Sequence, residues 1–305
     1  MNCLGFDTSN YTTSVAICGE NEIRSARRLL TVRQGERGLR QSDALFQHVK
    51  QIPVIIKEAG DMKDISAVGV SSRPRSVEGS YMPVFLAGEM AAETAAAVLG
   101  VPLYRFSHQD GHIMAGIHSA DAYGLLDEEF LSVHLSGGTT EIVRTCFNGS
   151  GFDTEIVGGT KDISAGQVID RTGVRLGMQF PCGKEMDMIS RTAETEIKLP
   201  VSVKEGFFNF SGLETKAATA GCDVPVLARS VFSAISKTLT LALRFCCDSY
   251  NINKILFVGG VASNGYIRDS ICNEFGDNGF FASPEMSTDN ACGIALLTRL
   301  VHSRR

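Results

Sequence analysis

The chain has 305 residues and a formal net charge of -5, and 44% of its residues are hydrophobic while 21% are charged. This is ordinary globular composition, which excludes a largely disordered chain, a collagen-like repeat and a long coiled coil. At roughly 150 residues per domain the length predicts about two domains, and the net acidity gives no sign of a nucleic-acid-binding protein.

The N-terminus and the cysteines indicate the compartment. The chain opens MNCLGFDTSN, without the basic region and long apolar run of a secretory signal. The most apolar long stretch, 82–103, is interrupted by Glu89 and Glu93 and predicts a buried helix rather than a membrane span. Nine cysteines are scattered with no CxxC pair, which favours reduced thiols. We therefore predict a cytoplasmic protein without membrane contact.

Two segments predict the same order of elements. Residues 3–17 and 132–143 each read as an apolar strand, a tight polar turn and a second strand. A third such turn follows a strand within 254–264, and helical periodicity covers 43–59, 81–99, 165–176 and 226–250. This alternation indicates an α/β fold with mixed sheets. The near-repeat predicts two related lobes with a cleft between them, over residues 1–127 and 128–305.

The three turns are rich in residues that suit a phosphate cradle. They contain Thr8–Ser9, Ser136–Gly137–Gly138–Thr139 and Gly259–Gly260. Small residues let backbone N–H groups approach a phosphate, and hydroxyls add donors. None of the turns matches a dinucleotide fingerprint or a P-loop. The alternative is that they only connect closely packed strands. Asn264, just after the third turn, is a candidate for a nucleotide sugar or base.

A histidine pair is the candidate metal site. His108 and His112 are four residues apart, so on a helix both imidazoles lie on one face. A metal would need a carboxylate from elsewhere, and Asp289 precedes a helix start rich in small residues. Two histidines and one carboxylate leave open positions, as in catalytic Zn or Fe(II) sites. The alternative is a surface histidine pair and an ordinary helix cap.

These strings together resemble the TsaD/YgjD family, the tRNA N6-adenosine threonylcarbamoyltransferases once labelled O-sialoglycoprotein endopeptidases. The matches run from end to end of the chain. They include LGFDTS at 4–9, LSGGTT at 135–140, AGQVIDRTGVRLG from 165, FNFSGLETKA at 208–217, FVGGVASN at 257–264 and STDNACGIA at 287–295. The resemblance implies the fold of the actin, heat-shock-chaperone and sugar-kinase ATPases, two ribonuclease-H-like lobes around a nucleotide cleft.

The resemblance also implies roles for individual residues. His108, His112 and Asp289 would hold one divalent metal, Fe or Zn, and the cofactor would be an adenine nucleotide, either ATP or an acyl-adenylate. The expected activity is metal-dependent transfer of a threonylcarbamoyl group from threonylcarbamoyl-adenylate to adenosine of tRNA, with TsaB-like and TsaE-like partner proteins. No residue is predicted to be catalytic. The nucleotide and substrate would contact Leu135, Ser136, Gly137, Gly138, Thr139, Asp170, Gly183, Asp187 and Asn264.

The chain departs from the family pattern in three places. Tyr11 and Thr12 stand where the family usually has an acidic pair, and Thr139 stands where it usually has a histidine. Arg73-Pro74-Arg75 replaces the usual Gly-Pro-Gly turn. Losing carboxylates and gaining guanidinium groups favours anion contacts. The alternatives are therefore a divergent paralogue that carbamoylates another acceptor, or a non-catalytic nucleotide-binding partner subunit.

A cluster of arginines is the candidate surface for RNA. Residues 24–40 contain six arginines and a single acidic residue, Glu36, which gives a local charge of about +5. Such a segment either contacts a tRNA backbone or forms a solvated face. The predicted anion or RNA contacts are Arg28, Arg33, Arg73 and Arg75.

Overall fold

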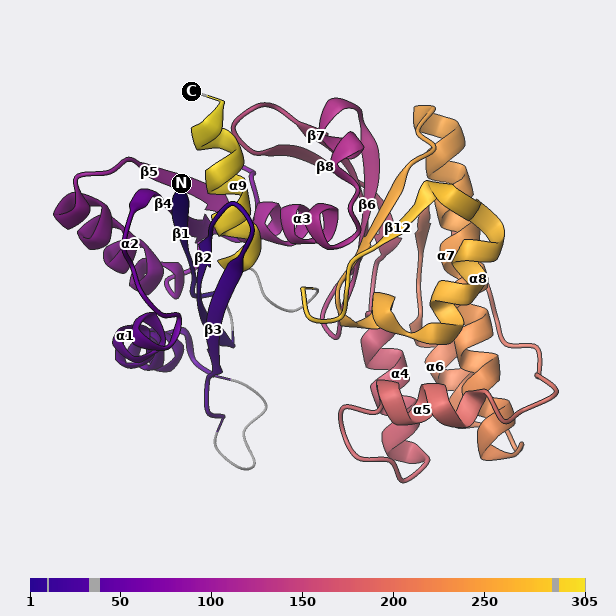
Figure 1. The fold of residues 1–305 in the computed structure, drawn as a ribbon. Coiled ribbons are helices and arrows are strands. Elements are labelled where there is room, and N and C mark those ends of the chain that lie inside the picture. The colour runs from indigo at the N-terminus through magenta and orange to yellow at the C-terminus, as the bar shows by residue number, and fades with distance from the viewer. Residues whose placement is uncertain (10, 33–38, 287–290, 305) are drawn as a thin grey trace. The chain divides into compact units, whose positions relative to one another are not determined.

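The computed structural model describes residues 1–9, 11–32, 39–286 and 291–304. Their contacts divide the chain into two compact units, drawn in Figure 1. The first unit comprises Met1–Asp121, Phe147–Asp153 and Glu285–Arg305, and the second comprises Ala122–Cys146 and Thr154–Pro284. The C-terminal helix thus packs within the first unit. The lobe boundary near residue 127 stays a prediction.

The first unit is built on a five-stranded mixed sheet. The strand order is β3 (Ile23–Leu29), β2 (Thr12–Cys18), β1 (Asn2–Asp7), β4 (Ile65–Arg73) and β5 (Leu103–Ser107). β1, β2 and β3 form antiparallel pairs, and β4 and β5 run parallel to β1. The predicted strand, turn and second strand over 3–17 are confirmed. The carboxyl ends of β1, β4 and β5 therefore lie along one edge of the sheet.

Helices cover both faces of this sheet, as Figure 1 shows. α1 (Gln41–Glu58) and α2 (Phe85–Leu99) pack on the face that carries Leu4 and Phe6, and α3 (His108–Ser119) and α9 (Ala291–Ser303) lie on the other side. Side chains alternate along a strand, so Gly5 faces α9. A Cβ on Gly5 would lie 2.6 Å from the carbonyl oxygen of Ala291. Glycine at this position lets α9 lie directly on β1.

The second unit is built on a seven-stranded sheet. Its order is β12 (Gly279–Phe281), β11 (Ile255–Val258), β6 (Phe130–Leu135), β7 (Thr140–Phe147), β8 (Phe152–Thr160), β10 (Phe207–Phe208) and β9 (Val203–Lys204). β6 and β7 form an antiparallel hairpin, and β11 runs parallel to β6. Both elements match the predictions made for 132–143 and 254–264.

One apolar core joins this sheet to its helices. Leu131, Val133 and Leu135 alternate along β6 into a cluster with buried side chains of the helices. The helices are α4 (Ala165–Arg175), α5 (Gly183–Ser190), α6 (Ser211–Ala218), α7 (Val224–Tyr250) and α8 (Gly265–Phe275), with the short 3-10 turns η1 (Tyr123–Asp127), η2 (Gly260–Ser263) and η3 (Gly276–Asn278). The helices predicted over 165–176 and 226–250 are confirmed as α4 and α7.

α7 is the central helix of the second unit. Within the described part of the chain, it is the one helix long and apolar enough to cross a membrane by length and composition, and 72% of its most apolar window is buried inside the protein. Such burial is that of a core helix.

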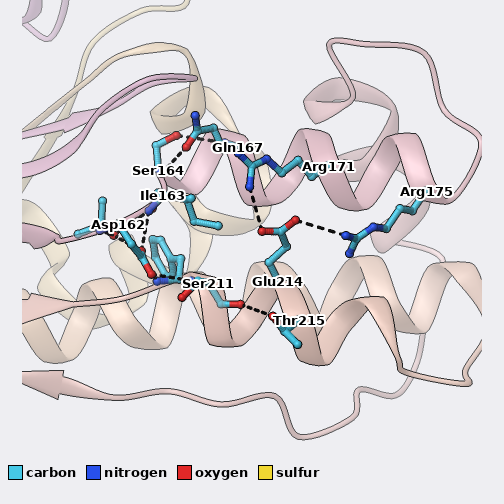
Figure 2. A network of polar contacts seen from close by, with 11 residues as sticks. Asp162, Ile163, Ser164, Gln167, Arg171, Arg175, Ser211, Glu214 and Thr215 are labelled. Carbon is cyan, nitrogen blue, oxygen red and sulfur yellow. Dashed lines mark hydrogen bonds and ion pairs between the residues drawn. The ribbon is translucent and has the colours of Figure 1, made fainter.

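A polar network fixes the start of α6, seen from close by in Figure 2. The backbone N–H of Phe210 donates to Asp162 Oδ1 at 2.8 Å, and that of Ser211 donates to Oδ2 at 3.0 Å. Burial acts to raise the pKa of Asp162, but hydrogen bonds from the side chain of Ser211 and from the backbone N–H groups of Phe210, Ser211 and Ile163 outweigh it and hold the pKa well below its usual range. Glu214 of α6 then pairs with Arg171 at 3.1 Å and Arg175 at 3.5 Å, which ties α6 to α4.

We expect Asp162→Asn to destabilise the second unit by about 1 kcal/mol at pH 7, because an amide has one acceptor oxygen where the carboxylate uses two to accept from three backbone N–H groups. The folded pKa of Asp162 is depressed, so its contribution is complete above the unfolded value of about 3.9 and is lost as the pH falls through the folded value. Urea unfolding at several pH values measures this, with the exposed Asp277→Asn as control. A difference between wild type and Asp162→Asn that stays constant below pH 4 would contradict it.

Candidate functional site

The histidine pair lies at the start of α3, in the first unit. Ser107 is the N-cap: its hydroxyl accepts from the N–H of Asp110 at 3.1 Å, and Asp110 Oδ2 accepts from the N–H of Ser107 at 2.8 Å. This capping box starts the helix at His108, directly after β5. His112 follows one turn later, and the two ring centroids are 4.8 Å apart with planes at 72°. The rings are therefore neighbours, as their spacing predicts.

Asp7 is a further residue of the candidate site, one that the sequence patterns did not single out. Its Oδ2 lies 2.8 Å from His108 Nδ1, and its Oδ1 accepts from the N–H of Ser9 at 2.8 Å. The side chain of Asp7 is 2% exposed. Burial acts to raise the pKa of Asp7, but the charge and hydrogen bond of His108 and the bonds from Ser9 hold it below the usual value. One sequence signal could have identified Asp7: it is an acidic residue at the end of an apolar strand. In a parallel sheet such a residue lies at the same edge as the ends of the neighbouring strands.

The turn after β1 is tied to α2. The Thr8 hydroxyl donates to the carbonyl of Val84 at 2.9 Å and accepts from the N–H of Gly88 at 3.2 Å. Phe85, at the start of α2, meets the His108 ring edge-on with centroids 6.2 Å apart. Tyr11, at one position of the missing acidic pair, is 37% exposed. His108 is therefore contacted from two sides, by the carboxylate of Asp7 before the turn and by the ring of Phe85 at the start of α2.

The start of α9 reaches the same region of the first unit. A Cβ on Gly293 would overlap the carbonyl oxygen of Gly111, so α3 and α9 touch backbone to backbone one residue before His112. Asp289, the predicted third ligand, lies outside the described residues. Among the residues that are described, no three histidine, cysteine or acidic side chains are grouped so as to hold a metal ion.

In the second unit, the Ser136–Thr139 turn connects β6 to β7. The Ser136 hydroxyl accepts from the N–H groups of Gly138 at 3.2 Å and Thr139 at 3.0 Å. Gly137 and Gly138 are exposed, and a Cβ on either would meet no atom within 4 Å. The exposed backbone of such a turn leaves room for an anion or another part of a ligand to bind.

The start of α4 packs tightly against this turn. The Ser164 hydroxyl, at the N-cap of α4, donates to the carbonyl of Gly137 at 2.7 Å. A Cβ on Gly166 would lie 2.6 Å from Gly137 Cα and from the carbonyl oxygen of Ser136. The positive end of the helix dipole therefore lies beside the Gly-Gly turn, where it favours anions.

The third predicted turn lies against the end of β6. Gly259 has φ +99°, a value that favours glycine, and a Cβ there would overlap the carbonyl oxygen of Leu135. β11 and β6 are parallel neighbours, so their carboxyl ends share an edge. The structure thus brings together the turns at Leu135–Thr139 and Gly259–Gly260.

The remaining predicted nucleotide contacts already make hydrogen bonds at helix ends. Asp170 Oδ1 accepts from the N–H of Cys182 at 2.8 Å, next to Gly183 at the start of α5. Asp187 accepts from the N–H groups of Gly265 at 3.1 Å and Tyr266 at 3.3 Å, and Asn264 caps α8 through the N–H of Ile267 at 3.0 Å. Asp187 and Asn264 therefore meet at the start of α8, while Asp170 and Gly183 meet between α4 and α5.

Several of the arginines predicted to contact RNA or another anion already have partners within the protein. Arg28 of β3 forms an ion pair with Glu58 of α1. Arg73 Nη1 donates to the Ser72 hydroxyl at 3.3 Å, and the backbone N–H of Arg75 donates to the Ser80 hydroxyl at 3.0 Å. Arg33 lies outside the described residues. The local positive charge expected over 24–40 is thus reduced where Glu58 of α1 pairs with Arg28 of β3.

A cavity of about 760 Å³ in the second unit lies elsewhere. The segment 197–201 and helices α7 and α8 line it, and none of the predicted nucleotide residues takes part. The cavity is therefore separate from the predicted nucleotide contacts.

Comparison with known proteins identifies relatives over nearly the whole chain. Residues 30–296 match the family described as TsaD, tRNA N6-adenosine threonylcarbamoyltransferase. The chain is 30% identical over 322 residues to the "Probable bifunctional tRNA threonylcarbamoyladenosine biosynthesis protein" of Methanothermobacter thermautotrophicus, covering 100% of this chain and 57% of that protein. It is also 30% identical to the tRNA N6-adenosine threonylcarbamoyltransferase of Bacillus cereus, covering 96% of this chain and 89% of that enzyme.

Solved structures share the fold at low sequence identity. Full-length HypF, in a phosphate- and nucleotide-bound form, matches with a TM-score of 0.64 at 13% identity, over 100% of this chain and 55% of HypF. A ROK family glucokinase from Streptomyces griseus matches with a TM-score of 0.52 at 11% identity, over 99% of this chain and 100% of the kinase. These likenesses confirm the predicted α/β fold of the actin and sugar-kinase ATPases, and they extend to the fold alone.

The packing of α4 on the Gly-Gly turn predicts opposite results for two glycine substitutions. Gly166→Ala should destabilise the protein by about 1 to 3 kcal/mol, because its Cβ meets backbone that cannot move aside. Gly137→Ala should change stability by less than about 0.5 kcal/mol, because its Cβ points into open space. Urea unfolding of both variants measures the difference, and equal destabilisation would contradict the packing described.

Proposed function

This chain belongs to the TsaD family of tRNA N6-adenosine threonylcarbamoyltransferases, and we propose that it transfers the threonylcarbamoyl group of threonylcarbamoyl-adenylate to adenosine in tRNA. The observation that carries the proposal is the family match over residues 30–296, together with a histidine pair held in place in the first unit. The proposal includes the lobes 1–127 and 128–305 and a cytoplasmic location, where tRNA is modified.

His108, His112 and Asp289 would hold the metal, iron or zinc. The donor set fits: two neighbouring imidazoles and one carboxylate suit either ion and leave positions open. The contact of Gly293 with Gly111 supports the third ligand, because Asp289 is four residues before Gly293 and His112 directly follows Gly111. When bound, the metal would neutralise phosphate charge and polarise the carbamoyl carbonyl.

The second unit would bind the adenylate. The exposed turn at Leu135–Thr139 lies against the start of α4, whose positive dipole would attract the phosphates. Asp187 and Asn264 cap α8, but each carboxylate or amide oxygen has a second lone pair, so both can still accept from ribose or adenine. Asp170 and Gly183, at the start of α5, complete the proposed pocket.

The transfer itself requires orientation more than base strength. The exocyclic N6 of adenosine attacks the carbamoyl carbon, the new N–C bond forms, and the bond from that carbon to the phosphate oxygen breaks to release AMP. The amine loses one proton in this step, and the proton passes to the departing phosphate group of AMP or to solvent. Positioning two bound reactants supplies much of such a rate enhancement. Arg73 and Arg75 are the proposed contacts for the anionic acceptor.

A second candidate function is carbamoyl transfer to a different acceptor. It is favoured by a difference in sequence: Tyr11 and Thr12 stand at the two positions where the family usually has acidic residues. A change of charge beside a reacting group alters which acceptors bind well.

A TsaB-like partner would bind α1 and α2, and a TsaE-like protein would assemble with the pair. These helices pack against each other and carry large apolar side chains that are unusually exposed: Phe46 by 64%, Leu86 by 44% and Met90 by 51%. Clustered exposed apolar residues mark protein interfaces.

His112→Ala should abolish stoichiometric metal and remove the modified adenosine, because one of two imidazole ligands is lost. Metal analysis of the purified protein measures the first effect. Incubation with threonylcarbamoyl-adenylate, tRNA and the partner proteins, followed by nucleoside analysis, measures the second. His118→Ala, in the last turn of the same helix, is the control and should retain both.

The outcomes separate the candidate functions. Wild-type protein with bound metal but no modified tRNA would favour another acceptor. Wild-type protein with neither metal nor activity would overturn the proposal in favour of a non-catalytic partner subunit.

Phe46→Glu should weaken binding to a TsaB-like partner by at least about tenfold, because a charge replaces a ring expected at the centre of the interface. Titration calorimetry with the purified partner measures the affinity. Val224→Glu, on an exposed position of the second unit, is the matched control. Equal affinities for wild type and Phe46→Glu would place the partner elsewhere.

A further inference from the structure

We propose that Asp7 is a positioning residue of the histidine pair: it holds His108 with the ring proton on Nδ1, so that Nε2 keeps the lone pair a metal requires. As far as the metal is concerned, this inference rests on the proposed function. Asp7 is not among the residues expected to contact metal or nucleotide, and its role here is to act through His108.

The geometry fixes both oxygens of Asp7. The N–H of Ser9 donates to Oδ1 at 2.8 Å, and Oδ2 lies 2.8 Å from His108 Nδ1. Asp7 ends β1, and the next residue, Thr8, is anchored to α2 by two hydrogen bonds. The side chain of Asp7 is 2% exposed, so it is shielded from water, which would otherwise compete for His108.

This arrangement selects one histidine tautomer. An ionised carboxylate can only accept hydrogen bonds. Nδ1 of His108 must therefore be the donor, and a neutral ring with its proton on Nδ1 carries its lone pair on Nε2. The capping box at Ser107 and the edge contact with Phe85 hold the rest of the ring in place.

A carboxylate in this position also makes the ring a better ligand. Hydrogen bonding of the second ring nitrogen to a carboxylate fixes ring orientation and raises ligand basicity, and losing such a partner typically costs about 10- to 100-fold in metal affinity. Because both oxygens of Asp7 already face donors, the geometry points to positioning rather than ligation.

Asp7→Asn provides a sharp test, because the amide should reverse the tautomer. The Ser9 N–H needs an acceptor, so the amide oxygen stays toward Ser9 and the amide NH₂ faces His108. Nδ1 must then accept, and the ring proton moves to Nε2. Nitrogen-15 NMR of histidine-labelled, metal-free protein at pH 8 reads the tautomer of His108 directly. We expect the Nδ1–H form in wild type and the Nε2–H form in Asp7→Asn.

The second measurement is metal affinity by chelator competition with Zn²⁺ or Fe²⁺. Asp7→Asn should bind about 10- to 100-fold more weakly than wild type, and Asp7→Glu, which keeps the charge, should recover part of the loss. Asp43→Asn is the control, because this exposed carboxylate of the first unit lies on α1 and not on β1 or α3. Its affinity should equal that of wild type.

The results separate this inference from the proposed function. An Nε2–H tautomer in wild type, or equal metal affinity in wild type and Asp7→Asn, would overturn the role of Asp7. Wild-type protein that binds no metal would overturn the proposed metal site. The tautomer of His108 in the wild-type protein would still decide the positioning role of Asp7. That measurement does not require Asp7→Asn to fold.

Discussion

The hydrogen bond between Asp7 and His108 is the interaction on which the candidate site of the first unit depends. It joins the carboxyl end of β1 to that of β5, and the strand between them, β4, runs parallel to both. Parallel strands deliver their C-terminal residues to one edge, so residues a hundred positions apart in sequence become neighbours without any local signal. The bond is partly buried, and its donor and acceptor are each held by a second contact, since Ser9 secures the carboxylate and the capping box secures the helix.

Close backbone packing is the second constraint, and glycine makes it possible. Gly5 allows α9 to lie on β1, and Gly293 allows the same helix to touch α3 beside His112. In the second unit Gly166 brings α4 onto the Ser136–Thr139 turn, and Gly259 brings the third turn onto β6. A single methyl group at any of these places would overlap a backbone atom of the neighbouring element. The glycine-rich composition therefore serves helix and turn packing as much as ligand contact.

The polar residues of the second unit illustrate how structural and binding roles combine. Asp187, Asn264 and Asp170 satisfy backbone N–H groups at helix starts, which otherwise lack partners. These bonds fix the side chains in position, and fixed acceptors bind a ligand with less loss of conformational freedom than mobile ones. Arg28 of β3 differs from these residues, because it forms an ion pair with Glu58 of α1. A count of charges along the sequence does not reveal such pairing.

The sequence alone determined the fold class, the strand and turn elements at 3–17 and 132–143, the helices α4 and α7, and the family, because these depend on hydrophobic periodicity and on strings of adjacent residues. It also placed His108 and His112 on one face, since helix geometry relates residues four apart. Only the tertiary structure assigned Asp7 to His108, packed the C-terminal helix into the first unit and paired Arg28 with Glu58. Each of these is a contact between distant segments, which sheet order and helix packing decide and which leaves no periodic trace in the chain.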